Sequence, residues 1–357
     1  MTVSAATLAR LGAELGLDAV GAAPAGPYES TERLIHERKA RGLFDTMGFT
    51  TTRPERSCHP EALLPGARTV IAAALSYYFP GGEPGPGEGR LPRYAWSDRY
   101  GELRAKLEAL GERLGGSWRV LVDDNAHVDR EAAARAGVGF YGKNTMLIAP
   151  GAGSWIVLGS LVTDVAVEPG DPVRPGCGSC TLCIDACPTG ALDDPGTLDA
   201  GRCLSWLSQR RAPIPPAARA AMGGTVYGCD ICQEVCPWNR GPEERRAGEP
   251  FPAGAEPVVS LVEWLRADPD ELRARYPRLY VQRNDPGVLR RNAAVALGNS
   301  GGAEHLALLE AVASGADGAA GADGLVAEHA AWGAARLRAR LAAGGPTDGR
   351  LTGPASP

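Results

Sequence analysis

The sequence contains no run of eighteen apolar residues, the length that a helix needs to cross a bilayer. Its first residues, MTVSAATLARLGAELGLDAVG, have the period of an amphipathic helix and neither the basic region nor the cleavage site of a secretory signal. Positive charge is not in excess either, because 42 acidic residues outnumber 37 basic ones and the formal charge is -5. These absences predict a cytoplasmic protein without a membrane partner, in which a polyanion could bind only at a local basic patch.

A dinucleotide fingerprint is also missing, because no G-x-G-x-x-G follows a strand-like run. Cysteine, in contrast, is plentiful, and eight of the nine cysteines lie between positions 177 and 236. Such crowding in a chain of 357 residues without a secretory signal favours a metal site over a disulfide framework.

The crowded cysteines form two runs. The first has the bacterial ferredoxin spacing C-x2-C-x2-C-x3-C-P, in which three thiolates bind one cubane and the fourth binds a second cluster. The second run has Val226 where its first cysteine should stand, and Cys203 is the nearby thiol that completes a second set of four. We therefore assign one 4Fe-4S cluster to Cys177, Cys180, Cys183 and Cys236, and another to Cys187, Cys203, Cys229 and Cys232.

Zinc knuckles are the alternative for these cysteines, since C-x2-C pairs suffice for zinc. Zinc, however, needs neither the third close cysteine nor the two Cys-Pro pairs. Cys58 is left over, and we expect a buried free thiol there in preference to a ligand or a nucleophile. Because clusters transfer single electrons, a second site must carry out the chemistry, and the residues alone indicate an iron-sulfur oxidoreductase of unknown substrate.

Composition divides the chain into three parts and a tail, which predicts an α+β fold class. Residues 1–170 alternate leucines at helical spacing with β-rich runs such as VIAAALSY and RVLVD, as in an N-terminal α/β domain. Residues 171–245 hold the cysteines and are expected to form a ferredoxin-like module with two 4Fe-4S clusters. Residues 246–345 resemble the paired helices of a HEAT-like domain, and residues 346–357 are expected to be disordered.

Several segments resemble one family, in order and over nearly the whole chain. They are LLPGARTVI, RYAWSDRY, RVLVDDNAHVDREAAARAGVGFYGKNTMLIAPGAGSWIVLGSLVTDV, YGCDICQEVCPWN and LRRNAAVALGN. Together they resemble the epoxyqueuosine reductases, cobalamin-dependent enzymes related in their core to reductive dehalogenases. The resemblance implies reduction of epoxyqueuosine to queuosine at the wobble position of tRNA, with cobalamin in the N-terminal domain. An external low-potential electron donor and a monomeric state are expected.

The resemblance also implies a proton donor. In the family it is the Asp of a V-D-[ST]-x-P run, and the matching residue is Asp123 in VLVDDNAHVDR. Taken alone, an Asp at a strand end is usually a cap or turn residue. A donor at neutral pH needs a raised pKa, which desolvation would supply. The chain departs from the family pattern at Asp124, Asn125 and Ala126, and at Gly101, where related sequences often have His.

The cobalamin site implied by the resemblance uses the G-K-N-T run, the GSWIVLG run and an arginine ahead of LLPG. The residues are Arg56, Lys143, Asn144, Ser154 and Gly159, together with the backbone near Leu147. The alternative is that Arg56 and Lys143 are solvated surface charges and that the glycines form turns. None of the five histidines stands in a D-x-H-x-x-G run, so no protein histidine is expected as the lower cobalt ligand.

A local basic patch does exist, at residues 273–291, where six arginines and one aspartate give a charge of +5. For a tRNA-modifying enzyme this segment is expected to contact the anticodon stem-loop, with Tyr276 and Tyr280 able to stack on bases. The expected contacts are Arg275, Arg278, Arg283, Arg290 and Arg291. The alternative is an ordinary solvated helix face with the tyrosines in the core.

Two other functions stay open at this point. A reductive dehalogenase-like reductase would share the clusters and cobalamin but act on a small molecule, and it would usually carry an export signal. A non-catalytic electron carrier or assembly factor would need neither the run around Asp123 nor the arginine patch.

Overall fold

The computed structural model describes residues 2–316 and 324–344, so the tail expected at 346–357 lies outside the described residues. The chain packs as two compact units, each assembled from separate segments. Of the described residues, the first unit consists of 2–80, 98–201 and 231–251, and the second of 81–97, 202–230, 252–316 and 324–344. The boundaries expected near 170 and 245 do not coincide with this division, because residues 171–245 contribute to both units.

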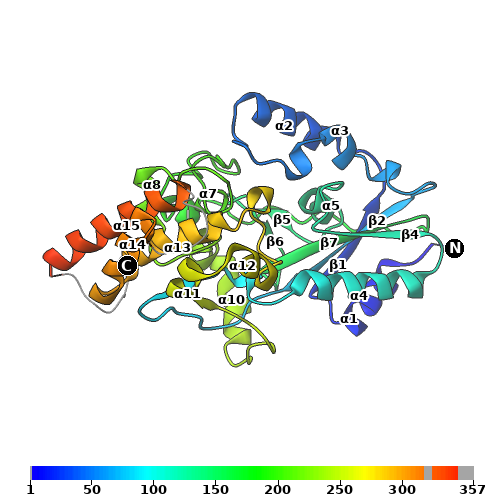
Figure 1. Ribbon diagram of the computed structural model, residues 1–357. Coiled ribbons are helices and arrows are strands. Elements are labelled where there is room, and N and C mark those ends of the chain that lie inside the picture. The colour runs from blue at the N-terminus through cyan, green and yellow to red at the C-terminus, as the bar shows by residue number, and fades with distance from the viewer. Residues whose placement is uncertain (1, 317–323, 345–357) are drawn as a thin grey trace. The chain divides into compact units, whose positions relative to one another are not determined.

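The centre of the first unit is a four-stranded sheet of order β1-β2-β7-β4, in which all neighbouring strands are antiparallel (Figure 1). Its strands are β1 (Ala19–Pro24), β2 (Thr69–Ser76), β7 (Ile156–Thr163) and β4 (Trp118–Val122). Strand β2 is buried along its whole length, as its run of apolar and small residues predicts. The β-rich runs of the sequence therefore became the strands of one sheet.

Helices cover both faces of this sheet. Helix α4 (Arg99–Leu114) starts at Asp98, whose side chain accepts a hydrogen bond from the Gly101 N–H, and it buries three of the predicted leucines. Gly159 of β7 lies against α4, whereas its neighbour Ser160 must point to the other face, where α5 (Asp129–Arg135) packs. Helix α1 (Ala5–Glu14) runs beside α4 in Figure 1.

The remaining elements of the first unit are short. They are α2 (Glu29–Ala40), η1 (Phe49–Thr51), α3 (Pro54–Ser57), η2 (Pro60–Ala62), the strand pair β5 (Phe140–Tyr141) and β6 (Leu147–Ile148), α6 (Leu182–Asp185), α9 (Ile231–Glu234) and α10 (Pro237–Arg246). The last three carry or follow cysteines of the two runs.

The second unit is mostly helical, as expected for the C-terminal part. It contains β3 (Glu88–Arg90) paired with β8 (Val258–Ser260), and η3 (Arg93–Ala95), α7 (Leu204–Leu207), α8 (Pro216–Ala221), α11 (Leu261–Arg266), α12 (Pro269–Arg275), η4 (Gln282–Asn284), α13 (Gly287–Ser300), η5 (Ala303–His305), α14 (Leu306–Ser314) and α15 (Gly324–Ala342).

Helix α13 forms the core of this unit, and each of its residues is buried. It approaches α15 closely at two glycines, since a Cβ on Gly298 would lie 2.5 Å from the Cα of Gly333. Nowhere in the described ranges is a helix both long and apolar enough to span a membrane.

Candidate functional site

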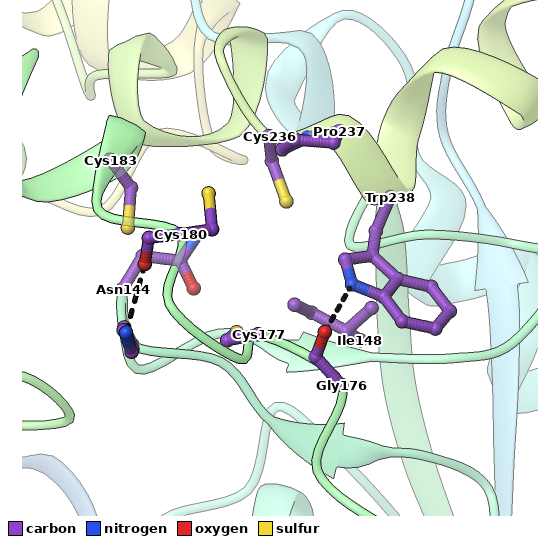
Figure 2. A pocket seen from close by; sticks show the side chains of 10 residues that line it. Asn144, Ile148, Gly176, Cys177, Cys180, Cys183, Cys236, Pro237 and Trp238 are labelled. Carbon is purple, nitrogen blue, oxygen red and sulfur yellow. Dashed lines mark hydrogen bonds between the residues drawn. The ribbon is translucent and has the colours of Figure 1, made fainter.

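A pocket in the first unit brings together the four cysteines predicted to hold the first cluster. Figure 2 shows these side chains around one space. The pocket is lined by Cys177, Cys180, Cys183 and Cys236, and by Lys143, Asn144, Ile148, Gly176, Pro237 and Trp238. Cys236 of the second run thus meets three cysteines of the first, the nearest of them Cys183, 53 residues earlier, as the ferredoxin spacing predicts.

The cysteine loop of this pocket is held by local geometry and by one lysine. The chain turns at Gly178, which has a φ of +49°, and the Cys180 N–H donates to the Cys177 carbonyl at 3.0 Å. The ammonium group of Lys143 donates to the carbonyls of Gly178 and Cys180, at 2.8 and 2.9 Å. Lys143 therefore lies at the cysteine loop, where it fixes the backbone that carries two of the thiols.

Trp238 borders the pocket on another side. Its indole N–H donates to the Gly176 carbonyl at 3.3 Å (Figure 2). Its ring meets that of Phe140 edge to face, with centroids 5.2 Å apart. A Cβ on Gly176 would lie 2.2 Å from the indole ring, so this position requires glycine. Trp238 keeps 38% of its surface exposed and so forms a wall between the pocket and solvent.

The four thiols of the pocket can ionise together only around a positively charged group. The pKa values of the Cys183 and Cys236 thiols are raised first by burial and then by the neighbouring cysteines. Four thiolates can share such a space only when metal charge compensates their repulsion. The thiols surround a volume and not a point, because no three potential ligands in the described ranges converge closely enough to hold a single metal ion.

The second predicted set of cysteines is divided between the units. Cys187 and Cys232 belong to the first unit, and Cys203 and Cys229 to the second, so their grouping stays a prediction from the sequence. Cys187 already accepts a hydrogen bond, with the Ala191 N–H 3.3 Å from its sulfur, a contact of the kind that stabilises thiolate ligands.

Cys58 is fully buried, and its burial raises its pKa to about 11. A thiol with this pKa stays protonated at neutral pH, and the expected burial of Cys58 is confirmed.

Asp123 follows directly on β4 and begins the loop 123–128 that leads into α5, which we call the Asp123 loop. Its φ is +51°, in the left-handed region that Asp tolerates better than most residues. The residue is exposed to solvent, yet partial burial of its carboxyl group, and then the charge of Asp124, raise its pKa above the usual value. This direction is the one that a proton donor requires.

Two further polar residues of this region were not singled out from the sequence. Asp129 has its pKa raised well above the usual range by burial and then by Asp123 and Asp124, and its Oδ1 has no hydrogen-bond partner among the described residues. His127 is fully buried, which lowers its pKa to about 4. In the sequence, the only signal for His127 and Asp129 is their position four and six residues after Asp123.

The side chains predicted to hold cobalamin lie in different surroundings. Ser154 is buried and bonded to Asn239, with its N–H donating to Oδ1 at 2.7 Å. A Cβ on Gly159 would meet Val122, Leu103 and Leu107, so this glycine serves the packing of α4.

The side chains of the other four predicted cobalamin residues also lie in different surroundings. Leu147 is in the apolar core, Lys143 contacts the cysteine loop, and the Asn144 amide donates to the Cys232 carbonyl at 3.3 Å. Only Arg56 is exposed, on α3. Most of these side chains thus have other contacts, and the cobalamin contacts, including the backbone near Leu147, stay a prediction.

The prediction that Arg290 and Arg291 contact tRNA is wrong, because both are buried in the second unit. Arg290 donates twice to the Leu265 carbonyl, at 3.1 and 2.9 Å. Arg291 donates to the carbonyls of Leu207, Arg210 and Ala212, at 2.8, 2.7 and 2.5 Å. Their charge stabilises backbone segments that would otherwise lack donors.

The rest of the basic segment is divided between core and surface. Tyr276 is buried against Trp264, with ring centroids 5.0 Å apart, so it cannot stack on bases as predicted. Arg275 and Arg278 both pair with Glu256, at 3.2 and 2.8 Å.

Other side chains of the segment are exposed. Arg283 is exposed, and Tyr280 keeps 42% of its surface accessible. Arg273 and Arg275 are exposed too, but each forms an ion pair with an acidic side chain.

The four thiols of the pocket are the ligand set that one 4Fe-4S cluster requires. Residues 176–239 match the family model of a 4Fe-4S double cluster binding domain, which makes the chain an iron-sulfur protein. Residues 57–129 match the model described as epoxyqueuosine reductase QueG, DUF1730.

Relatives extend this match over most of the chain. An epoxyqueuosine reductase of Lactococcus garvieae is 35% identical over 314 residues, which cover 85% of this chain and 89% of that protein. The chain belongs to the epoxyqueuosine reductase family.

Solved structures agree with this membership. The epoxyqueuosine reductase of Bacillus subtilis, with its aspartate catalytic loop swung out of the active site, superposes with a TM-score of 0.80 at 30% identity and covers 92% of this chain and 89% of that one. An epoxyqueuosine reductase with an epoxyqueuosine-modified tRNA-Tyr stem loop has the same TM-score, identity and coverage.

Proposed function

We propose that this enzyme reduces epoxyqueuosine in tRNA to queuosine. The likeness to the reductase that holds an epoxyqueuosine-modified stem loop, over 92% of this chain, carries the proposal. The reaction opens and deoxygenates an epoxide: two electrons and two protons enter, both carbon-oxygen bonds break, a carbon-carbon double bond forms and water leaves. The test is to supply the anaerobic enzyme, cobalamin and a low-potential reductant with a modified anticodon stem-loop and to measure the nucleoside by mass. Lack of queuosine, with reduction of a halogenated phenol instead, would favour a small-molecule reductase.

Two 4Fe-4S clusters, when bound, would supply the electrons one at a time. Cys177, Cys180, Cys183 and Cys236 would hold the first cluster, and the convergence of these four in one pocket supports that assignment. Cys187, Cys203, Cys229 and Cys232 would hold the second, because the count of eight leaves no thiol other than buried Cys58. An external low-potential carrier in the cytoplasm would reduce them.

Asp123 would deliver a proton to the departing oxygen. Its raised pKa and its accessibility support this role, since a donor must hold its proton at neutral pH and still reach the substrate. The aspartate catalytic loop of the Bacillus subtilis enzyme supports it further. We infer that the Asp123 loop is its counterpart.

Cobalamin is proposed as a cofactor because of the family resemblance. Arg56, Lys143, Asn144, Ser154 and Gly159 and the backbone near Leu147 would hold it, as the resemblance implies. Titration of the anaerobic protein with cobalamin, followed by its visible spectrum, tests the proposal. Unchanged spectra at saturating cobalamin would contradict it.

The tRNA surface would lie on the second unit. Of the predicted arginines, Arg283 is exposed beside Tyr280, whereas Arg275 and Arg278 are exposed or half-buried and already paired with Glu256. We therefore expect Arg283 to make the stronger phosphate contact. Helices α13, α14 and α15 would form the HEAT-like part that supports this surface, as their mutual packing suggests.

A further inference from the structure

The side chain of His127 links the Asp123 loop to the sheet. Its ring is completely buried, and Nε2 shares a hydrogen bond of 3.2 Å with the hydroxyl of Ser160, which is also completely buried. Ser160 belongs to β7, the strand that pairs with β4. The ring of Tyr28 lies against the histidine on another side, with centroids 5.8 Å apart. One side chain of the loop therefore reaches a central strand of the first unit.

Two further hydrogen bonds of the loop stay within it. The Ala126 N–H donates to Oδ1 of Asp124 at 2.8 Å, and the His127 N–H donates to the Asp124 carbonyl at 3.1 Å. These bonds close a turn, but they do not attach the turn to the sheet. The contact with Ser160 does, and the strand register places Ser160 opposite Leu121, two residues before Asp123.

The conformation at Asp123 needs such an attachment. A φ of +51° is unusual outside glycine and persists only where the surroundings hold it. Ala126 and Val128 add apolar packing against the core of the unit. Because apolar packing is not directional, whereas a buried hydrogen bond is, the histidine contact is the one that sets the orientation of the loop.

We propose that His127 is a positioning residue for Asp123: anchored on Ser160, it holds the loop so that the Asp123 carboxyl group faces the reacting oxygen. The inference rests on the proposed role of Asp123 as proton donor. The ring itself is buried and does not touch the substrate, so its effect is exerted through the loop.

Three variants of the holoenzyme test the anchor. His127→Leu keeps the apolar volume and removes the hydrogen bond, His127→Gln keeps a polar group near the position of Nε2, and Ser160→Ala removes the partner. Each is assayed on the modified anticodon stem-loop after its iron content and melting temperature are measured. We expect kcat to fall about tenfold or more in His127→Leu and Ser160→Ala, with KM within about twofold, and most of the loss to be recovered in His127→Gln.

A second readout does not depend on catalysis. Amide hydrogen exchange in residues 124–128 should accelerate about tenfold or more in His127→Leu, while exchange in β2 stays unchanged. Unchanged exchange and unchanged kcat in folded His127→Leu and Ser160→Ala would overturn the proposal.

Coupling to Asp123 separates positioning from general stability. In an Asp123→Asn background, His127→Leu should cause no further loss of turnover, because the donor that it positions is already gone. A further loss of the full size would mean that His127 acts elsewhere and would overturn the proposal. Full turnover in Asp123→Asn alone would refute the donor assignment and the positioning role with it, and exchange would then report only whether the anchor exists.

Discussion

Asp123 and Asp124 stand side by side where β4 ends, and their proximity affects how readily a proton can be held. Partial burial raises the pKa of Asp123 first, and the charge of Asp124 raises it further. Asp124 is one of the departures from the family pattern, but electrostatically it favours the protonated form of its neighbour. At the scale of single residues, the departure therefore supports an acid at position 123.

The raised pKa of Asp123 and its coupling to Asp124 predict different pH profiles of kcat for variants at the two positions. Asp123→Asn should slow turnover by a factor on the order of a hundred or more and abolish the alkaline limb of kcat, since the general acid is gone. Asp124→Asn removes a negative charge, which stabilises ionised Asp123, lowers its pKa and moves the alkaline limb to lower pH. The measurement is kcat against pH for both variants. A limb that stays in place in Asp124→Asn would contradict the coupling.

Cys203 lies outside both cysteine runs, yet the missing cysteine at Val226 assigns it to the second cluster. Cys203→Ser should reduce the iron content of the anaerobic protein from about eight to about four per chain, because one of two cubanes is lost. Cys58→Ala is the matched control and should keep about eight, since that thiol is buried among apolar residues. Iron analysis and the visible spectrum measure the number of clusters in both variants. Eight irons in Cys203→Ser would refute the ligand assignment.

At the scale of elements, α13 shows how a basic helix can belong to the core. Its two adjacent arginines are buried, and their guanidinium groups donate to carbonyls of α7, of the segment after α7 and of α11. A buried guanidinium is tolerated where its donors find such acceptors. The charge on this helix is thus structural, and the accessible charge of the basic segment lies before it.

Two arginine variants should therefore behave in opposite ways. Arg291→Ala should lower the free energy of unfolding by about 3 kcal/mol or more, because three carbonyls lose their buried donor. Arg283→Ala should change it by less than about 0.5 kcal/mol, yet weaken binding of the anticodon stem-loop and reduce the salt slope by about one. Arg338→Ala, an exposed arginine of α15, is the control. Equal binding by Arg283→Ala and Arg338→Ala would remove Arg283 from the tRNA surface.

At the scale of the whole molecule, buried neutral histidines lower the free energy of unfolding as the pH falls. His329 is fully buried, and desolvation lowers its pKa to about 4. Its Nε2 accepts from the Ile214 N–H at 3.0 Å, and its Nδ1 lies 2.7 Å from the Leu325 carbonyl. Protonation of Nε2 would break the first of these bonds.

The sign of the effect follows from proton binding. In the unfolded chain this histidine binds a proton below its usual pKa of 6.5, whereas in the folded chain it does so only near pH 4. The contribution of His329 to stability is therefore full above pH 6.5 and falls as the pH drops from 6.5 to about 4. His329 should contribute a loss of about 3 kcal/mol across it. Urea unfolding at several pH values should show a smaller acid loss in His329→Gln, although that variant is less stable at neutral pH. Parallel curves for the two proteins would contradict this prediction.

What the sequence determined by itself is local. The ferredoxin spacing identified the cysteines that meet in one pocket, the β-rich runs became β2, β4 and β7, and the leucine period became α4, because spacing along the chain controls each of these. The position of Asp123 at the end of a strand was equally readable.

What only the tertiary structure decided depends on contacts between distant residues. The composition of the basic segment states its charge but not that Arg291 is completely buried, since burial depends on carbonyls about eighty residues earlier. Lys143 was matched to cobalamin by motif, but it donates to the cysteine loop 35 residues further along. The contact of His127 with Ser160, 33 residues away in the sequence, likewise exists only in the folded structure. Side-chain partners of this kind are chosen by packing, which no local period encodes.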